Sequence, residues 1–429
     1  MPDYKKKKRK GIFSAPKPKQ VKGKRREHSE AQDIPMTPSG KKRSTVQHST
    51  GMKVVKGKKR ENSRRFKAFS SVAAVILVVV LLLELILPAG IIENTSNLIS
   101  LIGTGSYPLE LDGTKTINTV CYNNYYYILT NSHICAVSAS GKELFSYPHG
   151  FEKPIIKTCD TRALVFNQGG TQCLIFTLNG LRETVDTEKP IITAAISDNG
   201  TYAIVSRSEK YTAAVSVYSK RGKMLYEWYS AQETVNNVGI APNGKKIAVS
   251  TFASGVGSYT STLSVLNFKS ATPEYTETFD NTLIYNIDTS YHNGFGVVTG
   301  NTFKFIKWSK KYKSTEYKNE YGTALFRACA NGYVVVYNRE NDKTDNKIAV
   351  ISKNGSLKAE LEYKGIIGDI QYYGGHIYCM SDNDVQKLSL NGEILKTADC
   401  GFGAVRLSPL SNDSAAIITE NKIEKINFD

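Results

Sequence analysis

Residues that commonly carry catalysis or bind metals are scarce in this sequence. Its 429 residues include six histidines and two tryptophans, and its seven cysteines form no Cys-x-x-Cys pair. His133, His149, His292 and His376 lie too far apart in the sequence to form a short metal-binding motif. Neither a Walker loop nor a Gly-x-Ser-x-Gly nucleophile turn occurs. We therefore predict no catalytic residue, no metal and no cofactor, and leave the ligand-binding residues unknown.

Three fragments resemble functional motifs but fit ordinary β structure better. Residues 294–300 have part of the glycine spacing of a dinucleotide-binding fingerprint, but they open no predicted helix. His133 and Cys135 would share one face of a strand, which favours a core or surface pair over a metal site. Residues 382–384, Asp-Asn-Asp, lack the glycine and the distal glutamate of a calcium loop. We interpret them as a hairpin turn.

Charge is distributed unevenly along the chain. Residues 1–67 hold 23 of the 56 Lys and Arg residues but 5 of the 39 Asp and Glu residues, so the remainder is nearly neutral. This tail is rich in Lys, Pro, Ser and Gly, a composition that predicts disorder. We expect it to contact anionic lipid, with nucleic acid or an acidic protein as the alternative. The neutral remainder gives no reason to expect nucleic acid binding there.

One long apolar run separates the tail from the rest of the chain. Residues 68–87 would form a helix of about 30 Å, which matches the hydrocarbon core of a bilayer. Pro88 then ends the helix. We predict one transmembrane helix over residues 68–92. Because Arg64 and Lys67 flank its N-terminal side, we expect a cytoplasmic N-terminus and an extracytoplasmic C-terminal domain at the cell membrane.

Glu84 is the one charge in this run, near its far end, where a carboxylate can reach the headgroups. We interpret it as an interfacial residue. A partner-helix contact or a proton site is the alternative, which unchanged localisation and complex formation by Glu84→Leu would exclude. The run lies too far from the start for an ordinary signal peptide, although the Pro-Ala-Gly after it leaves cleavage open. Residues 93–106 are polar and predict a short stalk.

From Tyr107 onward, short β-rich runs alternate with turn residues. A turn of the form Ser/Thr-x-x-Gly ends at Gly141, Gly180, Gly222, Gly355 and Gly392. With degenerate copies near Ser270 and Lys311, neighbouring turns are about 37 to 48 residues apart. That period, with four strands per unit, is typical of a β-propeller blade.

The number of blades follows from counting these units. One unit has predicted strands at residues 191–197, 202–206, 211–218 and 224–229. Seven complete units are followed by three strands at residues 404–408, 415–419 and 422–427. Residues 107–115 supply a spare strand, and its pairing with these three would close the ring and remove exposed sheet edges. We predict an all-β, eight-bladed propeller over residues 107–429, with seven blades as the alternative.

Two turns carry a family resemblance. Ile196-Ser-Asp-Asn-Gly-Thr-Tyr-Ala-Ile-Val and Ile240-Ala-Pro-Asn-Gly-Lys-Lys-Ile-Ala-Val resemble the blade motif of WD40-like and TolB-like propellers. The Gly-His and Trp-Asp signatures of true WD40 repeats are missing. The whole layout is similar to an uncharacterised family of single-pass, membrane-anchored propellers of Gram-positive bacteria. The resemblance implies an envelope location and no known activity.

Cysteines and tyrosines allow two interpretations each. Cys121 and Cys159, like Cys135 and Cys173, are 38 residues apart, which favours equivalent core positions in successive repeats. Two disulfides are the alternative, which a non-reducing gel would reveal. Tyrosine is abundant, at 25 residues, with clusters at residues 125–127, 226–229 and 372–373. These side chains either fill the core or line a face that binds a glycan or a protein.

These observations predict a membrane-anchored binding, scaffold or sensor module of the cell envelope, and not an enzyme. The expected partners are the lipid bilayer and an envelope protein or glycan. The alternative is a propeller enzyme that acts on an envelope polysaccharide with active residues at the central channel. Clustered carboxylates or histidines at the channel mouth would favour the enzyme, whereas a flat, Tyr-lined face would favour binding.

Overall fold

A computed structural model describes residues 72–79, 91–113, 115–122, 124–309, 311–339 and 342–428. The predicted tail over residues 1–67 and Glu84 lie outside the described residues. Of the predicted membrane segment, residues 72–79 and 91–92 are described, and both stretches are helical. Among the helices of the described part, none has the length and apolar character needed to cross a bilayer.

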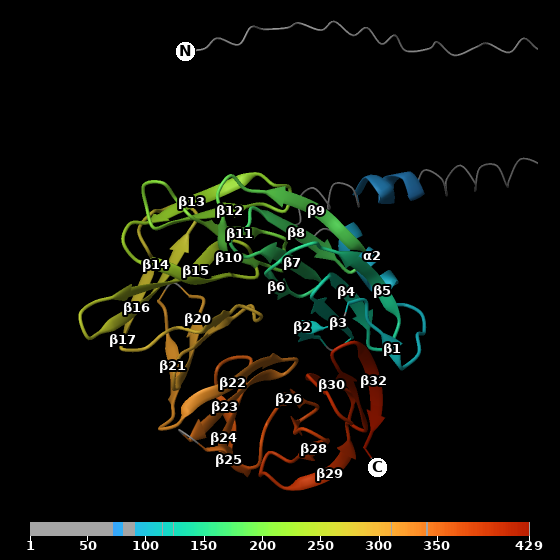
Figure 1. Cartoon of the computed structure of the whole chain (residues 1–429). Helices are drawn as coiled ribbons and strands as arrows, with labels where there is room; N and C mark the ends of the chain where they lie inside the picture. The colour runs from blue at the N-terminus through green and yellow to red at the C-terminus, as the bar shows by residue number, and fades with distance from the viewer. Residues whose placement is uncertain are drawn as a thin grey trace, which may run out of the picture. The chain divides into compact units, whose positions relative to one another are not determined.

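Eight four-stranded antiparallel sheets form a ring, which Figure 1 shows along its central axis. Blade 1 consists of β2 (Thr116–Cys121), β3 (Tyr125–Thr130), β4 (His133–Ser138) and β5 (Glu143–Pro148), and blade 2 of β6 (Pro154–Cys159), β7 (Arg162–Asn167), β8 (Gln172–Thr177) and β9 (Gly180–Asp186). Blade 3 consists of β10 (Ile191–Ile196), β11 (Tyr202–Ser206), β12 (Ala213–Tyr218) and β13 (Met224–Ser230). Blade 4 consists of β14 (Thr234–Ile240), β15 (Lys246–Ser254), β16 (Tyr259–Asn267) and β17 (Tyr275–Asp280). Blades 5 to 7 consist of β18 (Asn286–Asp288), β19 (Gly294–Val298), β20 (Thr302–Lys307), β21 (Ser314–Lys318); β22 (Gly322–Cys329), β23 (Gly332–Arg339), β24 (Asp342–Ser352), β25 (Leu357–Lys364); and β26 (Asp369–Tyr373), β27 (His376–Met380), β28 (Asp384–Leu388), β29 (Ile394–Asp399). The predicted eight-bladed propeller is confirmed.

Blade 8 joins the two ends of the domain. Its strands are β30 (Arg406–Ser411), β31 (Ser414–Ile418) and β32 (Lys422–Asn427), with β1 (Leu109–Glu110) as the outermost strand. Leu109 and Glu110 pair antiparallel with Ile423 and Lys422. The backbone N–H of Leu111 also donates to Asn421 O at 2.7 Å. The predicted closure of the ring by the N-terminal segment is therefore confirmed, although β1 is only two residues long.

Blade 3 shows why these sequences form this sheet. Its first three strands are apolar and largely buried, whereas β13 alternates between exposed and half-buried residues because only one of its faces is covered. Gly200 and Gly222 have φ angles of +83° and +73° in the turns after β10 and β12. Glycine adopts this backbone conformation without steric cost, so the recurrent Gly marks the turn.

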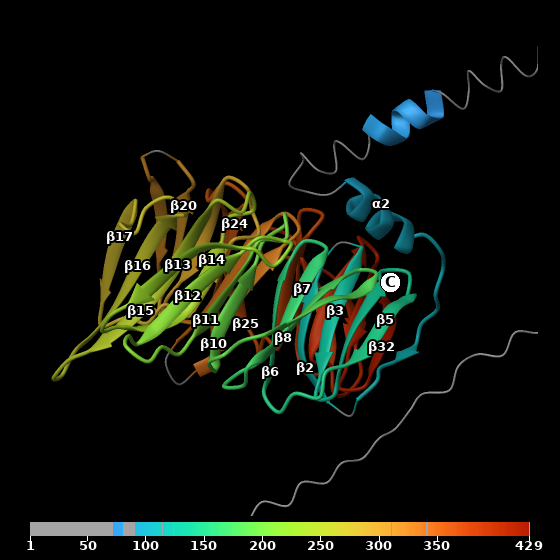
Figure 2. The same ribbon diagram turned by 90° about the horizontal axis from the view of Figure 1, so that it is seen from above.

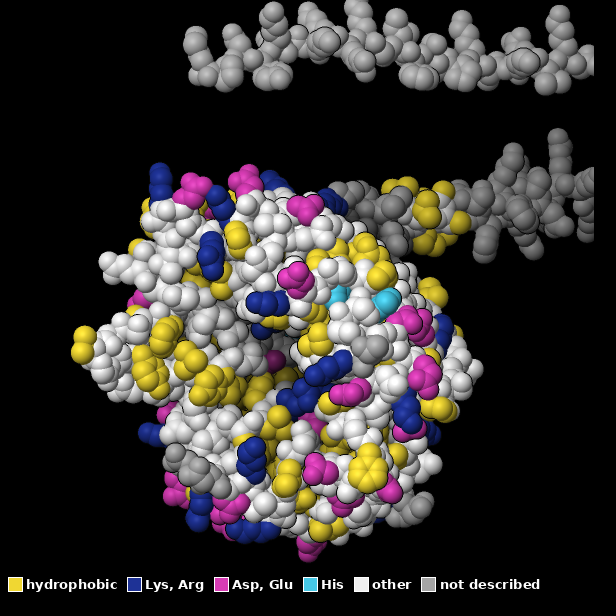
Figure 3. Space-filling view, in the orientation of Figure 1, with side chains coloured by type: hydrophobic (Ala, Val, Ile, Leu, Met, Phe, Trp, Pro, Cys, Tyr) yellow, Lys and Arg dark blue, Asp and Glu magenta, His cyan; other side chains and the backbone are white. Residues whose placement is uncertain are grey.

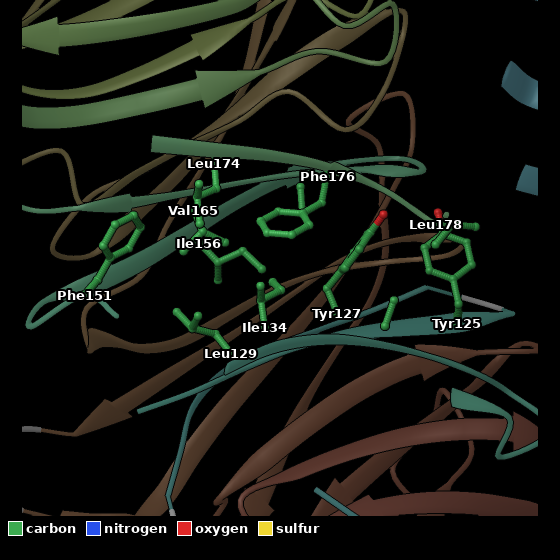
Figure 4. Close-up of a cluster of buried hydrophobic side chains, with 12 residues drawn as sticks. Tyr125, Tyr127, Leu129, Ile134, Phe151, Ile156, Val165, Leu174, Phe176 and Leu178 are labelled. Carbon is green, nitrogen blue, oxygen red and sulfur yellow. The ribbon is translucent and has the colours of Figure 1, made fainter. Parts of the chain in front are cut away.

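The core lies between neighbouring blades. Figure 4 shows one cluster in which Tyr127 and Leu129 of blade 1 face Val165 and Phe176 of blade 2. Because each blade packs mainly on its neighbours, the same apolar pattern recurs around the ring.

The cysteines and most clustered tyrosines belong to this core. All seven cysteines are free thiols, and only Cys121 is not fully buried, so the core interpretation holds and the disulfide alternative does not. Tyr125, Tyr126 and Tyr127 are buried on β3. Tyr229, by contrast, is exposed.

The predicted stalk, residues 93–106, contains a helix packed on the ring. Helix α2 (Ile91–Ser100) places Glu93 2.6 Å from Arg162 Nη1 and in contact with Arg182. Lys142 Nζ donates to Ser100 O and to Ile102 O, both at 2.9 Å, and so caps the helix. The helix was not foreseen because its inward face is polar rather than apolar.

We name the two faces of the ring by this helix. The α2 face consists of the turns that join the first strand to the second in each blade, and the third to the fourth in blades 1 to 7. The opposite face consists of the remaining loops. Figure 2 shows α2 beside the strand ends of the α2 face.

Candidate functional site

The central channel is the candidate site. It is a cavity of about 920 Å³ walled by the first strands of the blades and the turns that follow them. Charged and amide side chains line it, among them Asn118, Lys157, Asn243, Asp288, Arg327 and Arg406. Figure 3, which looks onto the opposite face, shows the hollow at the centre of the ring. A cavity of this size can enclose a small ligand or the end of a polymer.

A cluster of two arginines and one carboxylate lies on the wall formed by blades 6, 7 and 8. Asp369 is fully buried, accepts a hydrogen bond from Arg327 Nε at 2.7 Å and a second from the backbone N–H of Leu407 at 2.9 Å. Arg406 Nε is buried with no hydrogen-bond partner among the described residues. Burial and the nearby Arg327 lower the pKa of Arg406. One carboxylate thus faces two guanidinium groups, which leaves positive charge available to a ligand.

Lys157 and Asp288 form a second charged group in the channel. Burial lowers the pKa of Lys157, and the negative charge of Asp288 partly offsets this effect. Burial raises the pKa of Asp288, although the N–H and the hydroxyl of Ser290 both donate to it at 3.1 Å. The charged forms of both groups are therefore less stable than they would be in water. A polar ligand could supply the hydrogen bonds that burial has removed.

Carboxylates and a histidine lie together at the mouth on the α2 face. Asp198 Oδ1 accepts a hydrogen bond from Cys159 Sγ at 2.6 Å, and Asp198 Oδ2 is 3.6 Å from His292 Nδ1. Asp160 and Asp198 line the same cavity. Burial, together with the nearby Asp160, raises the pKa of Asp198. The side chain of His292 is 80% exposed.

Two fixed tyrosines flank this mouth. The ring of Tyr122 stacks on Tyr125 at 4.9 Å, and its hydroxyl donates to Thr158 Oγ1 at 3.0 Å. The hydroxyl of Tyr291 donates to Gly332 O at 2.9 Å. Rings held in this way present flat apolar surface at little cost in side-chain entropy, which suits a sugar or a peptide.

The thiols near the channel are poor nucleophiles. Burial raises the pKa of Cys121 and of Cys329 to about 12, and the pKa of Cys159 lies well above its usual value because of burial and the adjacent Asp198. At neutral pH a cysteine with so high a pKa is almost entirely in the thiol form, and too little thiolate is present for nucleophilic catalysis.

The site meets both sequence criteria in part. Asp160, Asp198 and His292 share one mouth, as the enzyme alternative requires, while Tyr122 and Tyr291 line the same mouth, as binding requires. No group of three His, Cys, Asp or Glu side chains in the described part of the chain could hold a metal ion. The arrangement can bind a polar or charged ligand through guanidinium, amide and aromatic groups.

The structure brings few of the residues considered from sequence to this site. Of the four histidines in the described part of the chain, only His292 reaches the channel; His149 is buried against Thr130 O. Cys135 donates weakly to Ile128 O and forms no pair with His133. Residues 294–300 form β19 and its turn, and residues 382–384 lie at a hairpin turn that ends at β28, as interpreted from sequence.

Sequence reasoning missed the channel charges. Lys157 and Arg327 each stand two residues before a cysteine that ends the first strand of a blade. A charged residue in an otherwise buried first strand was the available signal, because such strands face the axis on one side. Asp369 and Arg406 lie at strand starts and offered no such pattern.

Comparisons with known proteins found a family model and several solved structures. The sequence model of DUF5711, a family of unknown function, matches residues 106–428. BamB from Moraxella catarrhalis is 12% identical, with a TM-score of 0.48 over 76% of this chain and 99% of that chain. The propeller domain of Myceliophteria thermophila Cps50 (Swd1) is 8% identical, with a TM-score of 0.46 over 64% of this chain and 95% of that chain. No curated protein matches the chain.

Proposed function

Because the chain belongs to the DUF5711 family of unknown function, we propose its role from the channel itself: a binding or scaffold module of the cell envelope, without catalysis. In this proposal the propeller lies outside the cytoplasm, residues 68–92 anchor it to the cell membrane, and the basic tail contacts anionic lipid inside. The apolar run and the charge asymmetry of the sequence support this arrangement.

One observation carries the binding role. The buried Nε of Arg406 has no hydrogen-bond partner among the described residues. The nearby carboxylate of Asp369 forms its ion pair with Arg327 instead. A buried donor without a partner is costly, and a bound acceptor would remove that cost. The ligand would therefore offer carboxylate, phosphate or hydroxyl oxygens, as acidic glycans and acidic peptides do.

Site-specific crosslinking in intact cells tests this role. A photoreactive residue at Asn243, which lines the channel, should capture a glycan or protein, and the capture should weaken when Arg406→Gln is added. The same residue at Val256, in the exposed loop between β15 and β16, is the matched control. Equal capture at both positions, or capture that Arg406→Gln leaves unchanged, would contradict binding in the channel.

Protease added to intact cells tests the location. The proposal expects digestion of the propeller from outside, while an epitope in residues 1–67 stays protected until the membrane is opened. Protection of both parts would place the propeller in the cytoplasm and end the envelope proposal.

A second candidate function is hydrolysis or elimination on an envelope polysaccharide. Asp198 favours it, because burial and Asp160 raise the pKa of this carboxyl, as a general acid requires, and His292 lies beside it. Turnover of an acidic polysaccharide that Asp198→Asn abolishes and Arg221→Gln preserves would establish this function. Binding of the same polysaccharide without turnover would exclude it.

A further inference from the structure

Helix α2 packs on the ring through polar side chains, while it exposes two aliphatic side chains beside Thr95 and Ser96. Its inward side holds Glu93 against Arg162, and Asn97, which is 1% exposed and accepts a hydrogen bond from Asn179 Nδ2 at 2.9 Å. Its outward side holds Leu98, exposed by 66%, and Ile99. A helix on a water-soluble domain normally buries its apolar stripe and exposes the polar one.

The exposed apolar surface continues just past the helix. Ile102 is 71% exposed and stands four residues after Leu98, while the capping contacts of Lys142 hold this part of the chain in place. Three large aliphatic side chains therefore point away from the ring from a segment that is fixed to it. An exposed apolar cluster that is held in place in this way is a candidate contact for an apolar surface.

The position of α2 in the chain indicates what that cover is. The predicted membrane segment ends at residue 92, and Leu98 to Ile102 follow within ten residues. At about 1.5 Å per helical residue, they lie within about 15 Å of the end of that segment. That distance corresponds to the headgroup region, where amphipathic helices insert their apolar face.

Charge on the same face agrees with a lipid surface. The turns between third and fourth strands carry more basic than acidic residues. The basic residues include Lys142, Arg221, Lys223, Lys269 and Lys353, and the acidic ones are Glu274 and Glu393. In the loops of the opposite face, acidic residues outnumber basic ones. The turns between first and second strands on this face hold Asp160, Asp198 and Asp413 against Lys245, and Asp160 and Asp198 lie at the channel mouth. A basic rim fits anionic headgroups.

We infer that α2 is an interfacial helix that holds the α2 face of the propeller, with its channel mouth, against an anionic lipid bilayer. The inference rests on the membrane anchorage proposed above and sharpens it. The ligand of the channel mouth is then one presented at the bilayer surface, while the opposite face is free for soluble partners.

Tryptophan quenching by brominated lipid tests the contact. The full chain is reconstituted into phosphatidylcholine vesicles with about one third phosphatidylglycerol, with and without dibrominated acyl chains. The indole added by Leu98→Trp should lose at least half of its emission in brominated vesicles. Val256→Trp, at an even more exposed apolar site on the opposite face, should lose none, and the unsubstituted chain provides the background of Trp228 and Trp308.

Two further arms separate the possible failures. Flotation reports anchorage alone: if the chain floats but the Leu98→Trp indole is not quenched, the interfacial helix is refuted while anchorage stands. If the chain does not float, both fail. Replacing phosphatidylglycerol by neutral lipid, or introducing Arg221→Glu with Lys223→Glu, should reduce the quenching about twofold; no change in either would refute the role of the basic rim.

Discussion

The two faces of the ring are built on the same blades but carry different chemistry. The α2 face has the helix, the tyrosines and carboxylates of the channel mouth, and basic turns. The opposite face has acidic loops, the buried His149 and the protruding loop at Val256. The strands that connect the faces share one apolar pattern. The repeat therefore specifies the scaffold, while the turns, which the repeat constrains least, specify contacts.

The largest expected difference between the faces concerns Glu93. Glu93→Gln removes the charge that faces Arg162, whose side chain is 2% exposed, and breaking such a buried pair costs about 3–5 kcal/mol. We expect α2 to detach, with fast hydrogen exchange over residues 91–100. Glu209→Gln, which removes an exposed pair with Lys189 on the opposite face, should change nothing measurable. Equal effects of the two substitutions would remove the distinction between the faces.

The shared scaffold predicts equal effects in different blades. Ile204→Ala in blade 3 and Ile417→Ala in blade 8 both truncate fully buried side chains, and each should cost about 2–5 kcal/mol in the free energy of unfolding by urea. A much smaller cost for Ile417→Ala would show that the closing blade is packed less well than a continuous one.

Acid should loosen the two faces at different pH. Burial lowers the pKa of His149 below 6.5, so the stability it provides is lost as pH falls below 6.5 toward that lower value. Burial alone would raise the pKa of Glu93, but Arg162 and Arg182 outweigh it and hold the pKa below 4.5. The docking of α2 is therefore lost only as pH falls below 4.5. Hydrogen exchange at stepwise lower pH should show the loop at residues 149–151 opening before α2; the reverse order would contradict both assignments.

The smallest effect is expected from a single hydroxyl at the mouth. Tyr122→Phe removes the hydrogen bond to Thr158 and should cost about 0.5–1.5 kcal/mol in urea unfolding, while the stacked ring keeps its place. Tyr229→Phe, near the opposite face, should leave stability unchanged because its hydroxyl contacts an exposed Glu227. If Tyr122→Phe weakens ligand binding in the channel and Tyr229→Phe does not, the hydroxyl of Tyr122 contacts the ligand directly.

The fold could be predicted because its signals are local and repeated. Turns such as Gly222 and Gly355 require glycine at a positive φ angle, so the period of the blade is visible in the sequence. The blade count followed from one missing strand and one spare. Asp369 and Arg406 could not be placed, because their proximity depends on how blades 7 and 8 pack, where the N–H of Leu407 donates to Asp369. The polar inward face of α2 was missed because periodicity was sought in apolar residues.

The strand pairing that closes the ring constrains the order in which the domain can fold during synthesis. The hydroxyl of Thr116 donates to Glu420 O, which is 304 residues away in the sequence, and Leu109 pairs with Ile423. During synthesis the first strand of the domain leaves the ribosome early but has no partner until residues 422 and 423 are made. Blades 1 to 7 can form by local hairpins meanwhile, whereas β1 must be kept free of other strand edges. A chain truncated before residue 422 would keep most of its hairpins but would leave β1 and β31 without β32, the strand that lies between them, so residues 422–427 are needed to complete the ring.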